Sequence, residues 1–149
     1  MITRHAPTAA RILLGLIFFV FGLNGFLNFL PPQPPPPEAA GAFLGGLASA
    51  GYMFPLIKGT EVLAGLALLG NRFVPLALTL LAPVIVNIAA FHVFLAPGYA
   101  MVVALLGLEL FLAWSYRDSF RGVLAAKAVP SAAGEASSQR VPVAAPSGA

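Results

Sequence analysis

The sequence contains no cysteine and very few charged residues. Without cysteine, the chain forms no disulfide and carries out no thiol redox chemistry of its own, although this absence fits either side of a membrane. Only 9% of the 149 residues are charged, whereas a soluble domain typically carries about a quarter. Hydrophobic residues make up 59% of the chain. Such a composition cannot cover a water-exposed surface, and it predicts an all-α integral membrane protein.

Four apolar stretches predict four transmembrane helices, since about 20 helical residues cross the hydrocarbon core of a bilayer. We expect these spans at residues 12–30, 52–70, 75–95 and 99–116. The prolines of "PPQPPPP" end the first span, because six prolines in seven residues cannot be helical. The predicted fold is therefore a four-transmembrane-helix bundle.

Two further segments complete the predicted organisation. Residues 39–51 are mildly apolar but too short to span, which predicts a short extracytoplasmic or re-entrant helix between spans one and two. Residues 1–128 would form the membrane domain. Residues 129–149, rich in Ala, Ser and Pro, would form a disordered C-terminal tail.

The distribution of basic residues predicts the orientation of the spans. The net charge is +3, but the bases lie at the ends of apolar runs rather than on one polar face, so they indicate membrane topology and not a nucleic-acid partner. With both termini in the cytoplasm, seven of the eight bases lie inside, and the eighth is Lys58. Trp114 and Tyr116 would then mark the inner interface, and Tyr52 and Tyr99 the outer one.

Polar side chains gather in the outer half, or near the midplane, of every predicted span. A charge at the bilayer centre costs about 2.5–3.5 kcal/mol on insertion scales, so such residues indicate a function or an obligatory pairing. The predicted ligand-binding residues are Asn24, Asn28, Lys58, Glu61, Asn87, His92 and Glu109.

Several of these residues also fit a purely structural interpretation. Each asparagine can simply join helices by hydrogen bonds. Lys58 can extend to the outer interface or pair with Glu61, three residues further along the helix. A buried carboxyl needs a partner in either ionisation state, so we expect Glu61 to hydrogen-bond a side chain of another span. We further expect the cluster to line the main pocket, beneath a lid formed by residues 31–51.

A metal site is not expected, because the chain lacks cysteine and His92 is the only histidine within a predicted span. Glu61, Glu109 and His92 would form one only if they converged.

Several motifs carry a resemblance to a known family. They are "R-x-x-x-G" from Arg11, "FGLNG" from Phe21, "EVLAGLALLG" from Glu61, "PLALTLLAPVIVNIAAFHVFLAP" from Pro75 and "YRDSF" from Tyr116. Together, over residues 7–124, they resemble the DoxX family of small four-span membrane proteins. The last two motifs are similar to one bacterial branch of that family, which implies a location in the bacterial plasma membrane.

The resemblance implies a range of functions. Relatives are linked to thiosulfate:quinone oxidoreductases, to a membrane complex that handles thiol stress and, in animals, to receptor assembly, while most members have no assigned reaction. Family members often carry a lysine near the end of span one. This chain has Asn24 and Asn28 there, which departs from any charge-pair mechanism of those relatives.

We therefore expect a non-catalytic membrane subunit or accessory protein. Its outer polar pocket would hold a small amphipathic molecule, such as a quinone or a lipid, or dock another membrane or extracytoplasmic protein. No cofactor is identified from the residues, and quinone is the one that the resemblance suggests. The first alternative is a membrane subunit of a quinone-linked oxidoreductase, with Glu61, Glu109 or His92 handling protons. The second is a small transporter, and the oligomeric state stays open.

Overall fold

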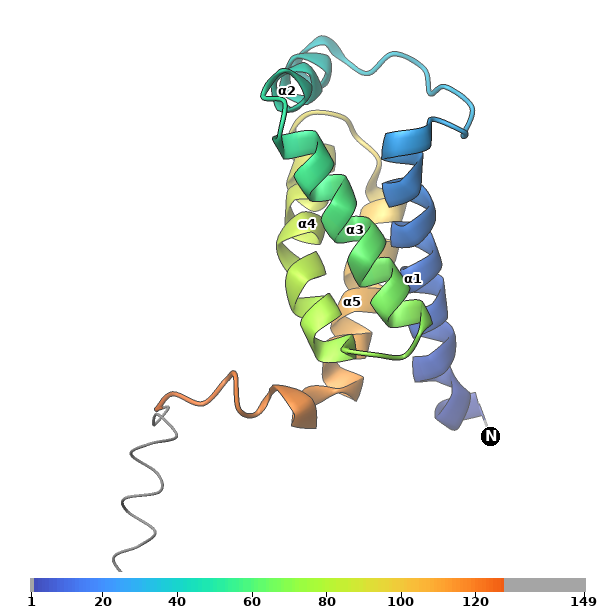
Figure 1. Ribbon diagram of the computed structural model, residues 1–149, viewed down its shortest axis with the longest axis vertical. Helices are drawn as coiled ribbons and strands as arrows, with labels where there is room; N and C mark the ends of the chain where they lie inside the picture. Colours follow the sequence, from blue (N-terminus) through green and yellow to red (C-terminus); the bar gives the residue numbers. More distant parts are fainter. Residues whose placement is uncertain (1, 128–149) are drawn as a thin grey trace, which may run out of the picture. The chain divides into compact units, whose positions relative to one another are not determined.

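The computed structural model describes residues 2–127, and this part of the chain contains five α-helices and no β-strand. The helices are α1 (Ile2–Leu27), α2 (Glu38–Ser49), α3 (Met53–Leu69), α4 (Val74–Phe94) and α5 (Tyr99–Ser115) (Figure 1). All five belong to a compact unit that ends at Arg117, and a second unit begins at Asp118. The expected tail at 129–149 lies outside the described residues.

Two of these helices are long and apolar enough to cross a membrane, namely α4 and the part of α1 that begins at His5. Helices α2 and α3 meet the same criteria only as a pair, and their axes differ by 90°. Helix α5 is apolar but shorter, with 17 residues. By length and composition, the described residues thus contain two to three candidate membrane-spanning helices, as expected of a helical membrane protein. The four predicted spans do not all meet these criteria.

The first helix differs most from the prediction, because it runs from Ile2 to Leu27 instead of from residue 12 to 30. Asn28 ends it by adopting a left-handed conformation with φ of 49°, which asparagine tolerates better than most residues. Leu30 N–H then donates to Oδ1 of Asn24 at 2.8 Å. The two asparagines therefore terminate α1 before the proline-rich segment is reached.

The other helices begin and end close to the predicted positions. Helices α3, α4 and α5 each start and stop within one residue of expectation. The turn between α3 and α4 is tight, with Asn71 and Phe73 both left-handed, and Pro75 lies in the first turn of α4, where it costs no hydrogen bond.

The four longer helices of the first unit, α1, α3, α4 and α5, pack side by side, and α2 lies across α3. Helix α1 packs most extensively on α3, and the other contacting pairs are α3 with α4, α4 with α5, α1 with α5, and α2 with α3. Their shared interior is aliphatic and aromatic. Its most deeply buried side chains are Leu14, Phe18, Leu68, Leu78, Leu81, Ile85, Leu105 and Leu112.

Small residues bring α1 and α3 into backbone contact. A Cβ atom placed on Gly65 would lie 2.6 Å from the backbone nitrogen of Phe19 and 2.9 Å from the carbonyl oxygen of Gly15. Neither neighbour is a side chain that could move aside. Glycine at position 65 is therefore required for this separation of the helices, as at close helix crossings in membrane proteins generally.

Arg11 joins the same two helices about one turn away from this contact. Arg11 is only 7% exposed. Its Nη1 donates to the carbonyl oxygen of Leu68 and, at 3.3 Å, to that of Leu69. These carbonyls belong to the last turn of α3, where the helix itself supplies no further N–H, and that of Leu68 also accepts from the N–H of Asn71 at 3.2 Å. Arg11 thus caps α3 from α1, besides lying on the side predicted to be cytoplasmic.

Candidate functional site

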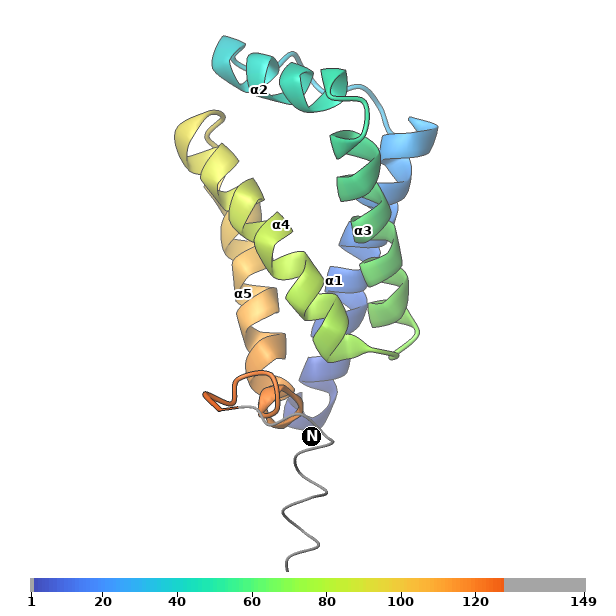
Figure 2. The same ribbon diagram turned by 60° about the vertical axis from the view of Figure 1, so that its left-hand side comes forward.

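A cavity of about 360 Å³ lies among helices α2, α3 and α4. In Figure 2, α3 and α4 diverge toward the end at which α2 crosses them. The lining residues are Phe43, Leu44 and Leu47 from α2, Met53, Phe54, Ile57, Lys58 and Glu61 from α3, and Pro83, Val84, Asn87, Ile88, Phe91 and His92 from α4. Four of the seven predicted site residues therefore share one cavity.

Helix α2 covers part of this cavity with an apolar face. Phe43, Leu44 and Leu47 occur at helical spacing and point to one side of α2. The ring of Phe43 lies 5.9 Å from that of Phe91 on α4, centroid to centroid. The expected lid is thus formed by α2, whereas the proline-rich segment is exposed and contributes no lining residue.

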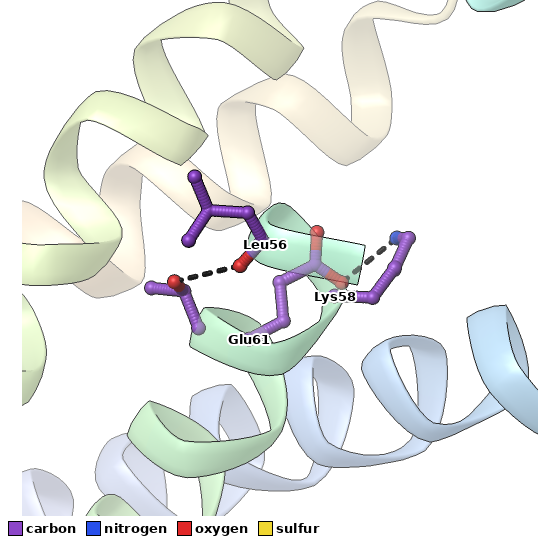
Figure 3. A network of polar contacts seen from close by, with 4 residues as sticks. Leu56, Lys58 and Glu61 are labelled. Carbon is purple, nitrogen blue, oxygen red and sulfur yellow. Dashed lines mark hydrogen bonds and ion pairs between the residues drawn. The ribbon is translucent and has the colours of Figure 1, made fainter. Parts of the chain in front are cut away.

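Lys58 and Glu61 form an ion pair at the cavity wall. Their Nζ and Oε2 atoms are 2.8 Å apart (Figure 3), and the side chains are 21% and 4% exposed, respectively. The Lys58 ammonium also lies 5.8 Å from the ring centroid of Phe54, within the range of a cation–π interaction. Both charges are therefore compensated within α3.

The prediction that Glu61 hydrogen-bonds a side chain of another span is wrong. Among the described residues, the hydrogen-bond partner of the Glu61 carboxylate is Lys58, on the same helix. An i,i+3 lysine is close enough to satisfy the carboxylate locally, so a second helix is not needed for this purpose.

Helix α1 makes room for the side chains of the ion pair, and its described residues form no hydrogen bond with them. A Cβ atom on Gly22 would lie 2.9 Å from Cβ of Glu61, and one on Gly25 would lie 2.5 Å from Cγ of Lys58. The two glycines are three residues apart, as are the two charged residues that they face. Sequence reasoning missed this role, although the matching spacing on the two helices was available as a signal.

His92 and Asn87 bring polar groups to the α4 side of the cavity. Nδ1 of His92 lies 2.8 Å from the carbonyl oxygen of Ile88. A carbonyl oxygen only accepts, so Nδ1 carries the proton and donates. The ring of Phe91 meets the imidazole edge-on at 5.3 Å, which holds the histidine in this orientation.

The remaining predicted residues lie elsewhere. Asn24 and Asn28 do not line the cavity, and their observed role is to end α1. Glu109 lies on α5, on the buried face that it shares with Val102, Leu105 and Leu112, and it too is absent from the cavity lining. The predicted cluster of seven is therefore separated into a cavity group, a helix end and a single buried carboxyl.

Glu109 is the least compensated buried group of the described residues. It is 7% exposed, and its Oε2 has no hydrogen-bond partner within the described part of the chain. No three His, Asp or Glu side chains come together within that part. The convergence of Glu61, Glu109 and His92 on which a metal site would depend is therefore not observed.

Comparisons of the chain with protein-family models, with curated proteins and with solved structures find no match.

Proposed function

We propose that the cavity among α2, α3 and α4 binds a small amphipathic molecule. The observation that carries this proposal is the composition of its lining, in which apolar side chains surround Lys58, Glu61, Asn87 and His92. Binding sites for small molecules combine an apolar wall with a few polar groups that orient the ligand, and they typically enclose about 300–1,000 Å³. The apolar wall would hold a tail, and the polar groups would hold a head.

The proposal places the four long helices across a membrane, with α2 on the outer surface and both termini in the cytoplasm. Large apolar side chains that face outward support contact with lipid, including Leu63 at 69% exposure, Phe94 at 81% and Val103 at 68%. Helix α5 is short, but Trp114 in its last turn and Arg117 just after it fit the inner interface. In this arrangement the chain is a DoxX-like accessory protein or subunit of a bacterial plasma membrane, not an enzyme.

Single cysteines test this topology, since the natural chain has none. Cysteine replaces Gln33 or Pro97 at the proposed outer loops, and Asn71 or Ser119 at the proposed inner ones. A membrane-impermeant maleimide should label the first two variants in intact cells, and the other two only after lysis. Labelling of Asn71→Cys from outside would show that α3 does not span.

Ligand binding is tested by a variant that fills the cavity. Val84 lines it, whereas Val86, on the same helix, does not and is 61% exposed. Native mass spectrometry and organic extraction of the detergent-purified protein should reveal a co-purifying amphipathic molecule in the wild type and in Val86→Phe. Val84→Phe should lose it. Equal retention by both variants would contradict binding in this cavity.

A further inference from the structure

The charges of the cavity restrict the ligand that it accepts. Lys58 and Glu61, which both line the cavity, neutralise each other's charge at 2.8 Å. The ammonium also faces the ring of Phe54. A ligand head that carried a net charge would enter a largely apolar site without an unpaired counter-ion, and this is costly in a medium of low dielectric constant.

His92 adds a second requirement, namely that the ligand head donates a hydrogen bond. Its Nδ1 donates to Ile88, and no described carboxylate forms an ion pair with the ring. When Nδ1 alone carries a proton, Nε2 is an acceptor. The cavity therefore offers donors on Lys58 and on the Asn87 amide, and an acceptor on His92. A hydroxyl complements both kinds of group, because it donates and accepts at the same time.

We propose that the ligand is an uncharged amphiphile whose head carries a hydroxyl group. The hydroxyl donates to Nε2 of His92 and accepts from Lys58 or Asn87, while the tail lies along the apolar walls of α2 and α4. This inference rests on the proposed function and adds to it the charge and the hydrogen-bonding pattern of the head. The head chemistry is shared by aliphatic alcohols, such as lipid hydroxyls, and by phenols.

A mixture of matched probes tests the inference on the full-length protein in detergent. Hexadecanol, hexadecyl methyl ether, hexadecanesulfonate and hexadecyltrimethylammonium share one chain and differ in the head. Native mass spectrometry of an equimolar mixture counts the molecules of each that the protein retains. The wild type should prefer hexadecanol over the ether by about tenfold, because the ether cannot donate and leaves a buried acceptor unpaired. It should prefer hexadecanol over both ions by about tenfold or more.

Variants separate the two parts of the inference. Glu61→Gln leaves the lysine charge uncompensated and should raise retention of the sulfonate by about tenfold. Lys58→Met combined with Glu61→Gln should restore the preference for the uncharged probe. His92→Phe should abolish the preference for the alcohol over the ether. Glu109→Gln is the matched control, since Glu109 is buried but lies outside the cavity, and it should leave every preference unchanged.

Each outcome is decisive. Retention of the sulfonate or the ammonium at least equal to that of hexadecanol by the wild type would overturn the charge requirement, and equal retention of the ether would overturn the hydroxyl requirement. Both results are measured on the wild type, so they do not depend on whether a variant folds. If Val84→Phe retained every probe as well as the wild type did, or if the wild type retained none, the proposed function itself would fail. A parallel mixture with para-decylphenol in place of hexadecanol shows whether the phenol or the aliphatic alcohol is the better head.

Discussion

The contact between α1 and α3 allows a sharp prediction for Gly65→Ala. The added Cβ would lie 2.6 Å from the backbone nitrogen of Phe19 and 2.9 Å from its Cα, whereas ordinary van der Waals contact begins near 3.4 Å. The helices must separate by several tenths of an ångström, because both atoms belong to the backbone of a helix. Overpacking of this kind costs about 1–3 kcal/mol in the free energy of unfolding.

The same helix supplies a matched control. A Cβ on Gly59 would meet no atom within 4 Å, and alanine is favoured over glycine in a helix by up to about 1 kcal/mol. Gly59→Ala should therefore leave stability unchanged or raise it. Both variants are measured by titrating the detergent-solubilised protein with a denaturing detergent, with helicity followed by circular dichroism.

The separation should also reach the site, since α3 carries Lys58 and Glu61 against Gly25 and Gly22 of α1. Gly65→Ala should weaken retention of a co-purifying amphiphile along with stability. If Gly65→Ala and Gly59→Ala unfolded at the same denaturant concentration, the close backbone contact between α1 and α3 would be refuted.

Three further pairs of substitutions test other parts of the structure by the same unfolding measurement. Arg11→Met removes the donor to the carbonyls of Leu68 and Leu69 and should cost about 1–3 kcal/mol, whereas Arg121→Met, at an exposed pair, should change nothing; equal effects would rule out the cap. Asn28→Gly should be tolerated because φ there is 49°, and Asn28→Val should destabilise by about 1–2 kcal/mol; tolerance of valine would contradict the left-handed helix end. Glu109→Leu should stabilise by about 1–3 kcal/mol, because Oε2 is buried without a partner among the described residues, whereas Glu61→Leu should destabilise because it leaves Lys58 unpaired; the opposite signs are the expected signature.

The helix boundaries could largely be predicted from the sequence, for a physical reason. Helices α3 and α4 end where apolar residues give way to glycine, asparagine or proline, and these residues stop helices locally whatever the tertiary structure. Helix α5 ends where its apolar run gives way to the polar and charged residues from Ser115 onward. Helix α1 was misjudged because Phe29 and Leu30 continue the apolar run after the backbone has already turned at Asn28. Hydropathy indicates where a helix is favourable, whereas the helix end is decided by one backbone conformation.

The lining of the cavity was predicted only in part. The sequence indicates how far along a helix a residue lies, but it indicates much less well in which direction around the helix axis the side chain points. Depth placed Asn87 and His92 level with Lys58 and Glu61, and the structure brings all four to one cavity. Glu109, predicted near the middle of its span, lies on the buried face of α5 and outside the cavity lining. Asn24 carries the same amide as Asn87, but it lies on α1, none of whose described residues lines the cavity, and its Oδ1 accepts from the Leu30 N–H.

Photo-crosslinking from α4 tests the central claim most directly, namely that a specific amphipathic molecule occupies the cavity. Benzoylphenylalanine replaces Phe91, which lines the cavity, or Phe94, which is 81% exposed on the same helix. After irradiation of whole membranes, mass spectrometry of the intact protein reads the added mass. The proposal predicts one defined adduct, or one family of adducts with a common head, at position 91 and a mixture that follows the bulk phospholipids at position 94. The same phospholipid mixture at both positions would contradict a selective binding site.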